Sequence, residues 1–138
     1  MTTPQFVPYE MKTTRVEVTS YENKQIRGRI INPYLGKTVA FDNLMQLLLR
    51  LEALYDSLNY PQLGMEHRTF AQEDAKPDEP AEADSGGPVL ASFLVSVMFR
   101  QRASWQGRLV WTEKELESQF RSTLELIFLM DSALSQTI

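Results

Sequence analysis

Arginine and tryptophan side chains are concentrated in one short stretch of the sequence, "FRQRASWQGRLVW" at residues 99–111. A guanidinium group binds carboxylates and phosphates with two parallel hydrogen bonds, and an indole ring stacks on aromatic groups such as nucleic-acid bases. The stretch also has the pattern of a strand, a turn and a second strand. Two interpretations follow: a surface that binds an acidic partner, or a hairpin whose large residues belong to the core.

The alternation of side chains along a strand divides this stretch between two faces of a sheet. We expect the face that carries Trp105 and Trp111 to pack on helices, so both tryptophans are predicted to be core residues. Arg108 then lies on the opposite face, which we expect to point to water. The candidate binding residues share this outward basic face or its turns, here or in the first half of the chain: Arg27, Arg29, Arg100, Arg102 and Arg108.

Residue types that support catalysis are scarce. The sequence contains no cysteine, which excludes disulfides, zinc knuckles and thiol nucleophiles, and it contains one histidine, His67. It has no glycine-rich phosphate loop, nucleophile elbow or paired-carboxylate motif. We interpret Glu113, Glu115 and Glu117 as a solvated surface. The sequence therefore predicts a protein that is not an enzyme, with no cofactor and no metal.

The acidic residues are unevenly distributed along the chain. Residues 73–84, "EDAKPDEPAEAD", carry six acidic residues against one lysine and contain no aromatic or β-branched residue. Such a segment cannot bury enough apolar surface to offset the entropy lost on ordering it. We therefore predict an acidic disordered linker at residues 63–90. The rest of the chain is nearly balanced in charge, although the whole chain has a formal net charge of -4.

The sequence shows no pattern of export or membrane insertion. Its N-terminal residues lack a cationic start followed by an apolar run, which is the pattern of a secretory signal. The longest apolar stretch, "LMQLLLRLEALY", is interrupted by Arg50 and Glu52 and is too short to cross a bilayer. We expect a cytoplasmic protein with no membrane partner.

The two halves of the chain resemble each other when 79 is added to each residue number of the first half. Identical residues then coincide: Val16 with Val95, Val18 with Val97, Gly28 with Gly107, Arg29 with Arg108, Phe41 with Phe120, and Leu47 with Leu126. Conservative matches continue around these identities. Self-similarity at a fixed offset is the pattern expected of an internal repeat.

Both halves also predict the same order of elements. Alternating apolar residues predict strands at residues 15–22, 26–32, 93–99 and 105–111, with a short turn inside each pair. A brief extended piece at 38–41 or 118–120 is a candidate third strand. Each half then predicts a helix that begins with a capping box, at Asn43–Gln46 and at Ser122–Glu125.

These elements predict an α+β fold, in which two pseudo-symmetric β-β-(β)-α repeats form one antiparallel sheet with two helices packed on one face. The expected boundaries are a flexible N-terminal segment at 1–11, a first repeat at 12–62, the linker at 63–90 and a second repeat at 91–138. The two repeats are expected to form one globular domain together.

The second half, "FRQRASWQG" followed by "FRSTLELIFLMDSAL", resembles small bacterial proteins of uncharacterised function. The shared pattern comprises an aromatic-Arg-Gln motif, a Ser-Trp-Gln-Gly motif and a Phe-Arg-Ser-x-Leu-Glu-Leu motif. The resemblance covers only the second half, and no activity is known for such proteins. It implies only that the hairpin and residues 120–122 belong to one recurring unit.

The sequence favours a non-catalytic protein-interaction module, such as an adaptor, an inhibitor or an accessory protein. Leu49 and Phe128 widen the apolar surface of the two helices beyond one stripe, which favours a protein partner or a homodimer. One alternative is a nucleic-acid-binding protein that uses the basic hairpin faces. A second alternative is small-ligand binding in a cleft at the pseudo-twofold axis between the repeats.

Overall fold

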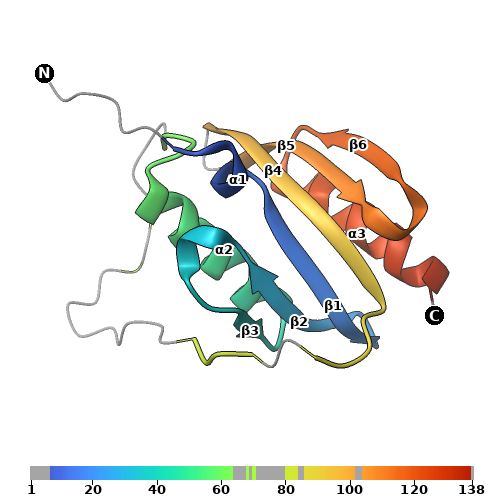
Figure 1. Ribbon diagram of the computed structural model, residues 1–138. Coiled ribbons are helices and arrows are strands. Elements are labelled where there is room, and N and C mark those ends of the chain that lie inside the picture. Colours follow the sequence, from blue (N-terminus) through green and yellow to red (C-terminus); the bar gives the residue numbers. More distant parts are fainter. Residues whose placement is uncertain are drawn as a thin grey trace, which may run out of the picture.

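The protein forms a six-stranded antiparallel sheet in the order β3-β2-β1-β4-β5-β6, in a computed structural model that describes residues 7–63, 68, 70, 80–83, 86–101 and 104–137. The strands are β1 (Thr14–Glu22), β2 (Gln25–Ile31), β3 (Val39–Phe41), β4 (Ala91–Gln101), β5 (Ser104–Trp111) and β6 (Leu116–Phe120). The helices are α1 (Tyr9–Lys12), α2 (Leu44–Leu58) and α3 (Thr123–Thr137), with 3-10 turns η1 (Pro33–Leu35) and η2 (Thr112–Lys114). β1 and β4 lie side by side at the centre of the sheet (Figure 1).

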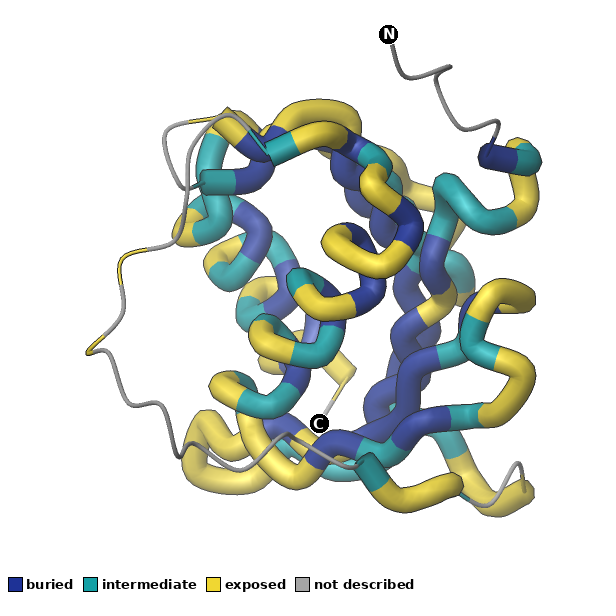
Figure 2. Tube along the Cα trace, turned by 90° about the vertical axis from the view of Figure 1, so that its left-hand side faces the viewer, coloured by how far each residue is buried: buried dark blue, intermediate teal, exposed yellow. Residues whose placement is uncertain are grey.

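The long helices α2 and α3 cover the same face of the sheet (Figure 1). The main core lies between the sheet and these helices, where apolar residues from one face of the strands meet one stripe of each helix. In Figure 2 the central strands are mostly buried or intermediate along their length, whereas buried and exposed residues alternate along the two long helices. The predicted α+β class, with one antiparallel sheet and helices, is confirmed.

The two halves have corresponding strand registers, offset by 79 residues. Equivalent pairs are Val18 with Gly28 and Val97 with Gly107, and also Gly28 with Phe41 and Gly107 with Phe120. At the centre, Arg15 of β1 pairs with Leu94 of β4. These two residues are also equivalent to each other, because the offset of 79 places position 15 on position 94. The same offset therefore relates the strand pairing in one half to the strand pairing in the other.

Side-chain caps begin both long helices, as the sequence pattern predicts. Asn43 Oδ1 accepts a hydrogen bond from the backbone amide of Gln46 at 2.8 Å, and Ser122 Oγ accepts one from the amide of Glu125 at 3.1 Å. The side chains of Gln46 and Glu125 accept in return from the amide of the residue before each cap, both at 2.7 Å. Both predicted caps are therefore present at equivalent positions of the two halves, and the return bond goes to the amide before the cap rather than to that of the cap residue itself.

A β-bulge in each hairpin changes which residues face the helices. The pairing of β4 with β5 shifts between Val97 and Phe99, and the pairing of β1 with β2 shifts between Val18 and Ser20. One extra residue reverses the alternation of the strand beyond it. Phe99 is consequently 52% exposed, whereas Arg100 is 1% exposed. The prediction that Arg100 lies on the outward face is wrong for this reason.

Glycine occupies the same position in both hairpins because the neighbouring strand approaches closely there. A Cβ atom on Gly28 would lie 2.0 Å from the carbonyl oxygen of Glu17, and one on Gly107 would lie 1.9 Å from that of Ser96. No side chain fits at such distances, so each glycine is required by the bulged pairing of its hairpin.

Some residues within both segments predicted to be flexible have defined contacts. Most of the predicted linker lies outside the described residues, but Ala81 and Ala83 add to the sheet edge at β3. Ala40 N donates to the Ala81 carbonyl at 3.1 Å, and Ala83 N donates to the Thr38 carbonyl at 2.8 Å. Near the N-terminus, Val7 is buried against α2. The globular unit therefore extends into both segments.

Candidate functional site

Arg100, one of the predicted binding residues, lies in a buried polar cluster between β4 and α2. Its Nε donates to the Pro61 carbonyl at 2.6 Å, and its Nη1 donates to Asp56 Oδ1 at 2.7 Å and to Glu52 Oε1. The guanidinium group also lies over the Tyr55 ring, 5.9 Å from the ring centroid. Arg100 therefore binds groups of its own chain and does not present its charge to an external partner.

Trp105 completes this cluster, which we call the Arg100 cluster: Glu52, Tyr55, Asp56, Arg100 and Trp105. Trp105 Nε1 donates to Glu52 Oε2 at 3.1 Å, and its ring meets the Tyr55 ring edge to face with the centroids 5.6 Å apart. Burial raises the pKa of Tyr55 well above its usual range. Trp105 and Trp111 are both buried, so the prediction that they are core residues is confirmed.

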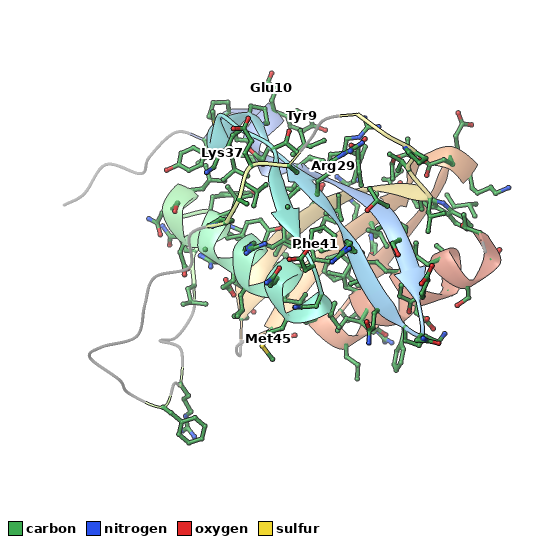
Figure 3. All side chains as sticks on the ribbon, turned by 90° about the horizontal axis from the view of Figure 1, so that it is seen from below. Tyr9, Glu10, Arg29, Lys37, Phe41 and Met45 are labelled. Atoms are coloured by element: carbon green, nitrogen blue, oxygen red, sulfur yellow. The ribbon has the colours of Figure 1, made fainter. Side chains whose placement is uncertain are left out.

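Arg29 is also buried, on the face of the sheet opposite the helices. Its Nε donates to Glu17 Oε1 at 2.6 Å, and its Nη1 donates to the Gly86 carbonyl at 2.9 Å. Figure 3 shows Arg29 beside the segment that leads into β4, with Phe41 on the other side of the sheet. The predicted exposure of Arg29 is wrong, because the end of the linker passes over it.

The other predicted arginines do not form one surface with Arg29 and Arg100. Arg27 Nε lies 3.5 Å from Asp42 Oδ1, and Arg108 Nη1 lies 3.3 Å from Glu117 Oε1. Both pairs are largely exposed. Arg102 lies outside the described residues. Each described arginine of the predicted set thus has a carboxylate partner, which leaves little uncompensated positive charge at these positions.

The outer surfaces of α2 and α3 carry large exposed apolar side chains, which we call the helix face: Met45, Leu49, Leu124 and Phe128. These side chains are between 58% and 72% exposed. They form two pairs with i, i+4 spacing, one on each helix, at equivalent positions of the two halves. Figure 3 shows Met45 projecting away from the sheet. The helix face is therefore apolar surface that the described part of the chain leaves uncovered.

A cavity of about 270 Å³ opens between the β1–β2 hairpin and α3. We call it the hairpin pocket, and its lining includes Tyr21, Lys24, Ile26, Ile127, Phe128, Asp131 and Leu134. Its walls are mainly apolar, and Asp131 supplies the carboxylate. Phe128 belongs to both the pocket and the helix face, so the two features adjoin.

Hydrogen bonds and burial together set the protonation states at the hairpin pocket. Tyr21 Oη donates to Asp131 Oδ1 at 2.5 Å, and Lys24 Nζ donates to the same oxygen at 2.7 Å. The Lys24 hydrogen bond, with that of Tyr21, lowers the pKa of Asp131 from its ordinary value. Burial, together with the Asp131 carboxylate, raises the pKa of Tyr21 to about 12. At neutral pH the pocket therefore presents a carboxylate and a neutral phenol.

Two features are absent from the described residues: a side-chain cluster that could hold a metal ion and a helix that could span a membrane. In this part of the chain, no group of three or more His, Asp or Glu side chains is placed to hold a metal ion. No helix in the described ranges is long and apolar enough to cross a membrane. The helix face and the hairpin pocket are the surfaces from which a function can be argued.

No protein family model matches the sequence, and no curated protein or solved structure is significantly similar to it. The function must therefore be inferred from the geometry of the chain itself.

The sequence interpretation missed the hairpin pocket. The internal offset of 79 could have indicated it, because Asp131 is equivalent to Glu52 under this offset, and the smaller Ile26 is equivalent to Trp105. Only the bulged registers bring Tyr21 and Arg100 to these carboxylates, and the bulges are not visible in the alternation of residue types.

Proposed function

We propose that this protein is a non-catalytic protein-interaction module that binds through the helix face. The observation that carries the proposal is the exposure of two equivalent pairs of large apolar side chains on adjacent helices. Leu44 of α2 and Phe128 of α3 line the same pocket, so the start of α2 lies near α3. Soluble monomers rarely leave a large contiguous apolar patch open to water, and such patches mark interaction sites.

The partner that fits this face best is a second copy of the same chain. A twofold dimer needs a surface that is complementary to itself, and the two halves repeat the same apolar pair. The helix-face side chains are uncharged, so a second copy meets no like-charge repulsion there. Beside Leu124, the charge of Glu125 is compensated within the chain, since Arg121 Nη2 lies 2.6 Å from Glu125 Oε2.

Nucleic-acid binding is a weaker proposal. Phosphate binding needs lysine and arginine side chains that are free to displace counterions. Arg29 and Arg100 are buried, and Arg27 and Arg108 are paired with carboxylates. The geometry therefore favours an apolar protein partner.

The proposal is tested by measuring the mass of the protein in solution by sedimentation equilibrium. At high micromolar concentration the parent chain is expected to sediment as a dimer of its 15.9 kDa chain. Leu49→Lys and Phe128→Lys are each expected to give monomers, because a lysine buried in an apolar interface would lose its hydration without gaining a partner.

Leu116→Lys is the matched control. Leu116 is 59% exposed, similar to Leu49, but it lies on the edge strand β6. This variant is expected to remain a dimer. A parent chain that is monomeric at high micromolar concentration would overturn the proposal of a second copy as the partner.

A further inference from the structure

The hairpin pocket and the Arg100 cluster occupy equivalent places in the two halves. In each, the end of a central strand contacts a carboxylate on the helix of the other half: Tyr21 contacts Asp131, and Arg100 contacts Glu52. The equivalent residues under the offset of 79 are Tyr21 and Arg100, Ile26 and Trp105, Asp131 and Glu52, and Leu134 and Tyr55. The Arg100 cluster therefore shows how the space between a hairpin and a helix is packed when the equivalent side chains are larger.

In the Arg100 cluster, an indole ring occupies the space between hairpin and helix. The Trp105 ring packs edge to face on Tyr55, and its Nε1 donates to Glu52 Oε2. The other oxygen, Oε1, accepts from Arg100. The carboxylate thus uses one oxygen for the strand residue and the other for the indole N–H.

In the hairpin pocket, the equivalent positions hold Ile26 and Leu134, which are smaller than the Trp105 and Tyr55 of the other half. A cavity of about 270 Å³ lies beside these smaller side chains. A dry apolar cavity of roughly 150 Å³ is enough for one benzene ring. The pocket is therefore large enough for a bicyclic aromatic ring.

Both carboxylate oxygens of Glu52 accept hydrogen bonds from side chains, whereas among the described residues only one oxygen of Asp131 does. Asp131 Oδ1 accepts from Tyr21, Lys24 and Ser135, with the Ser135 contact at 3.4 Å. Within the described part of the chain, Oδ2 accepts no hydrogen bond. It is the counterpart of the Glu52 oxygen that accepts the indole N–H of Trp105.

We propose that the hairpin pocket binds a small molecule with a planar bicyclic aromatic ring and a neutral ring N–H, of the indole class. The ring packs against the pocket wall that includes Ile26 and Leu134, and its N–H donates to Asp131 Oδ2. Lys24 already neutralises the Asp131 charge, so the ligand needs a hydrogen-bond donor rather than a positive charge.

Indole itself is the probe, and methyl-group chemical shifts of the pocket residues Ile26, Ile127 and Leu134 report its binding. The parent chain is expected to show saturable shifts at these methyl groups. The ligand 1-methylindole has nearly the same shape but no N–H, and it is expected to bind about tenfold more weakly because it lacks one hydrogen bond. Equal affinity for the two ligands would overturn the role of Asp131.

Ile26→Trp should fill the pocket with the side chain that the other half uses, and should lower the affinity for indole at least tenfold. Leu134→Tyr is a second filling variant with the same expected result, which keeps the test decisive if one variant folds poorly. The matched control is Ile31→Trp, because Ile31 lies on the same strand but on the opposite face of the sheet. It should bind indole like the parent.

Unchanged affinity in folded Ile26→Trp, or no shift in the parent chain, would overturn the proposal. The same titration on Leu49→Lys separates this proposal from that of the dimer, because Leu49 does not line the pocket. Phe128 belongs to both surfaces, so a dimer can only restrict access to the pocket, and the monomeric Leu49→Lys variant should bind indole at least as tightly as the parent.

Discussion

Arg100→Ala is expected to destabilise the fold by about 3 kcal/mol, whereas Arg108→Ala is expected to cost less than about 1 kcal/mol. The two arginines lie on paired strands, β4 and β5, and both have carboxylate partners. They differ in burial: the Arg100 side chain is 1% exposed and that of Arg108 is 43% exposed. This contrast makes Arg108 the matched control.

The magnitude for Arg100 follows from what its removal leaves behind. Glu52 and Asp56 lose their shared cation, and the buried Pro61 carbonyl loses its donor. Removing one partner of a buried ion pair costs about 3–5 kcal/mol. The low end applies because the side chains of Glu52 and Asp56 are 20% and 45% exposed and recover some hydration.

Urea denaturation followed by tryptophan fluorescence measures this difference. Trp105 and Trp111 are both buried in the folded chain, so their emission reports unfolding. With a urea slope of about 2 kcal/mol per M, a loss of about 3 kcal/mol lowers the midpoint by about 1.5 M. Arg100→Lys should fall between parent and alanine variant, because an ammonium group keeps the charge but cannot reproduce the fork of hydrogen bonds. Equal, small losses for Arg100→Ala and Arg108→Ala would refute the role of the Arg100 cluster.

Two further predictions concern the second half of the chain. Gly107→Ala should lower the unfolding free energy by about 3 kcal/mol, because its Cβ would lie 1.9 Å from the backbone oxygen of Ser96. The control is Gly86→Ala, whose added Cβ would have no neighbouring atom within 4 Å. It should leave the unfolding free energy unchanged in the same urea titration. Glu125→Gln should reduce the pH dependence of the melting temperature between about 4.5 and 2, because the hydrogen bond from the Arg121 side chain lowers the pKa of Glu125 from 4.5 to about 2. Because the pKa of Glu125 is lower in the folded chain than in the unfolded chain, ionised Glu125 stabilises the fold at pH values above 4.5. This stabilisation is lost as the pH falls toward 2.

Each of these predictions has a contradicting result. A stable Gly107→Ala protein would show that the strand carbonyl moves aside at little cost. An acid melting profile that is identical in parent and Glu125→Gln would show that the Arg121 pair does not persist in solution.

Local patterns in the sequence determined the elements and the class of the fold. The alternation of Phe93, Val95 and Val97 predicts a strand because side chains of a strand alternate between two faces. The capping boxes at Asn43 and Ser122 predict the helix starts because they depend only on residues within one turn. These signals need no knowledge of distant contacts, so the sequence alone predicts one antiparallel sheet with helices, and buried tryptophans.

Tertiary pairing decided which polar residues lie in the core and where a pocket is open. The bulge after Val97 exists only in the pairing of β4 with β5, and it turns Arg100 toward α2 against the simple alternation. The hairpin pocket depends on Ile26 and Leu134, which lie far apart in the sequence and meet only when α3 packs on the β1–β2 hairpin. Strand register and helix packing are long-range properties, and the types of neighbouring residues do not encode them.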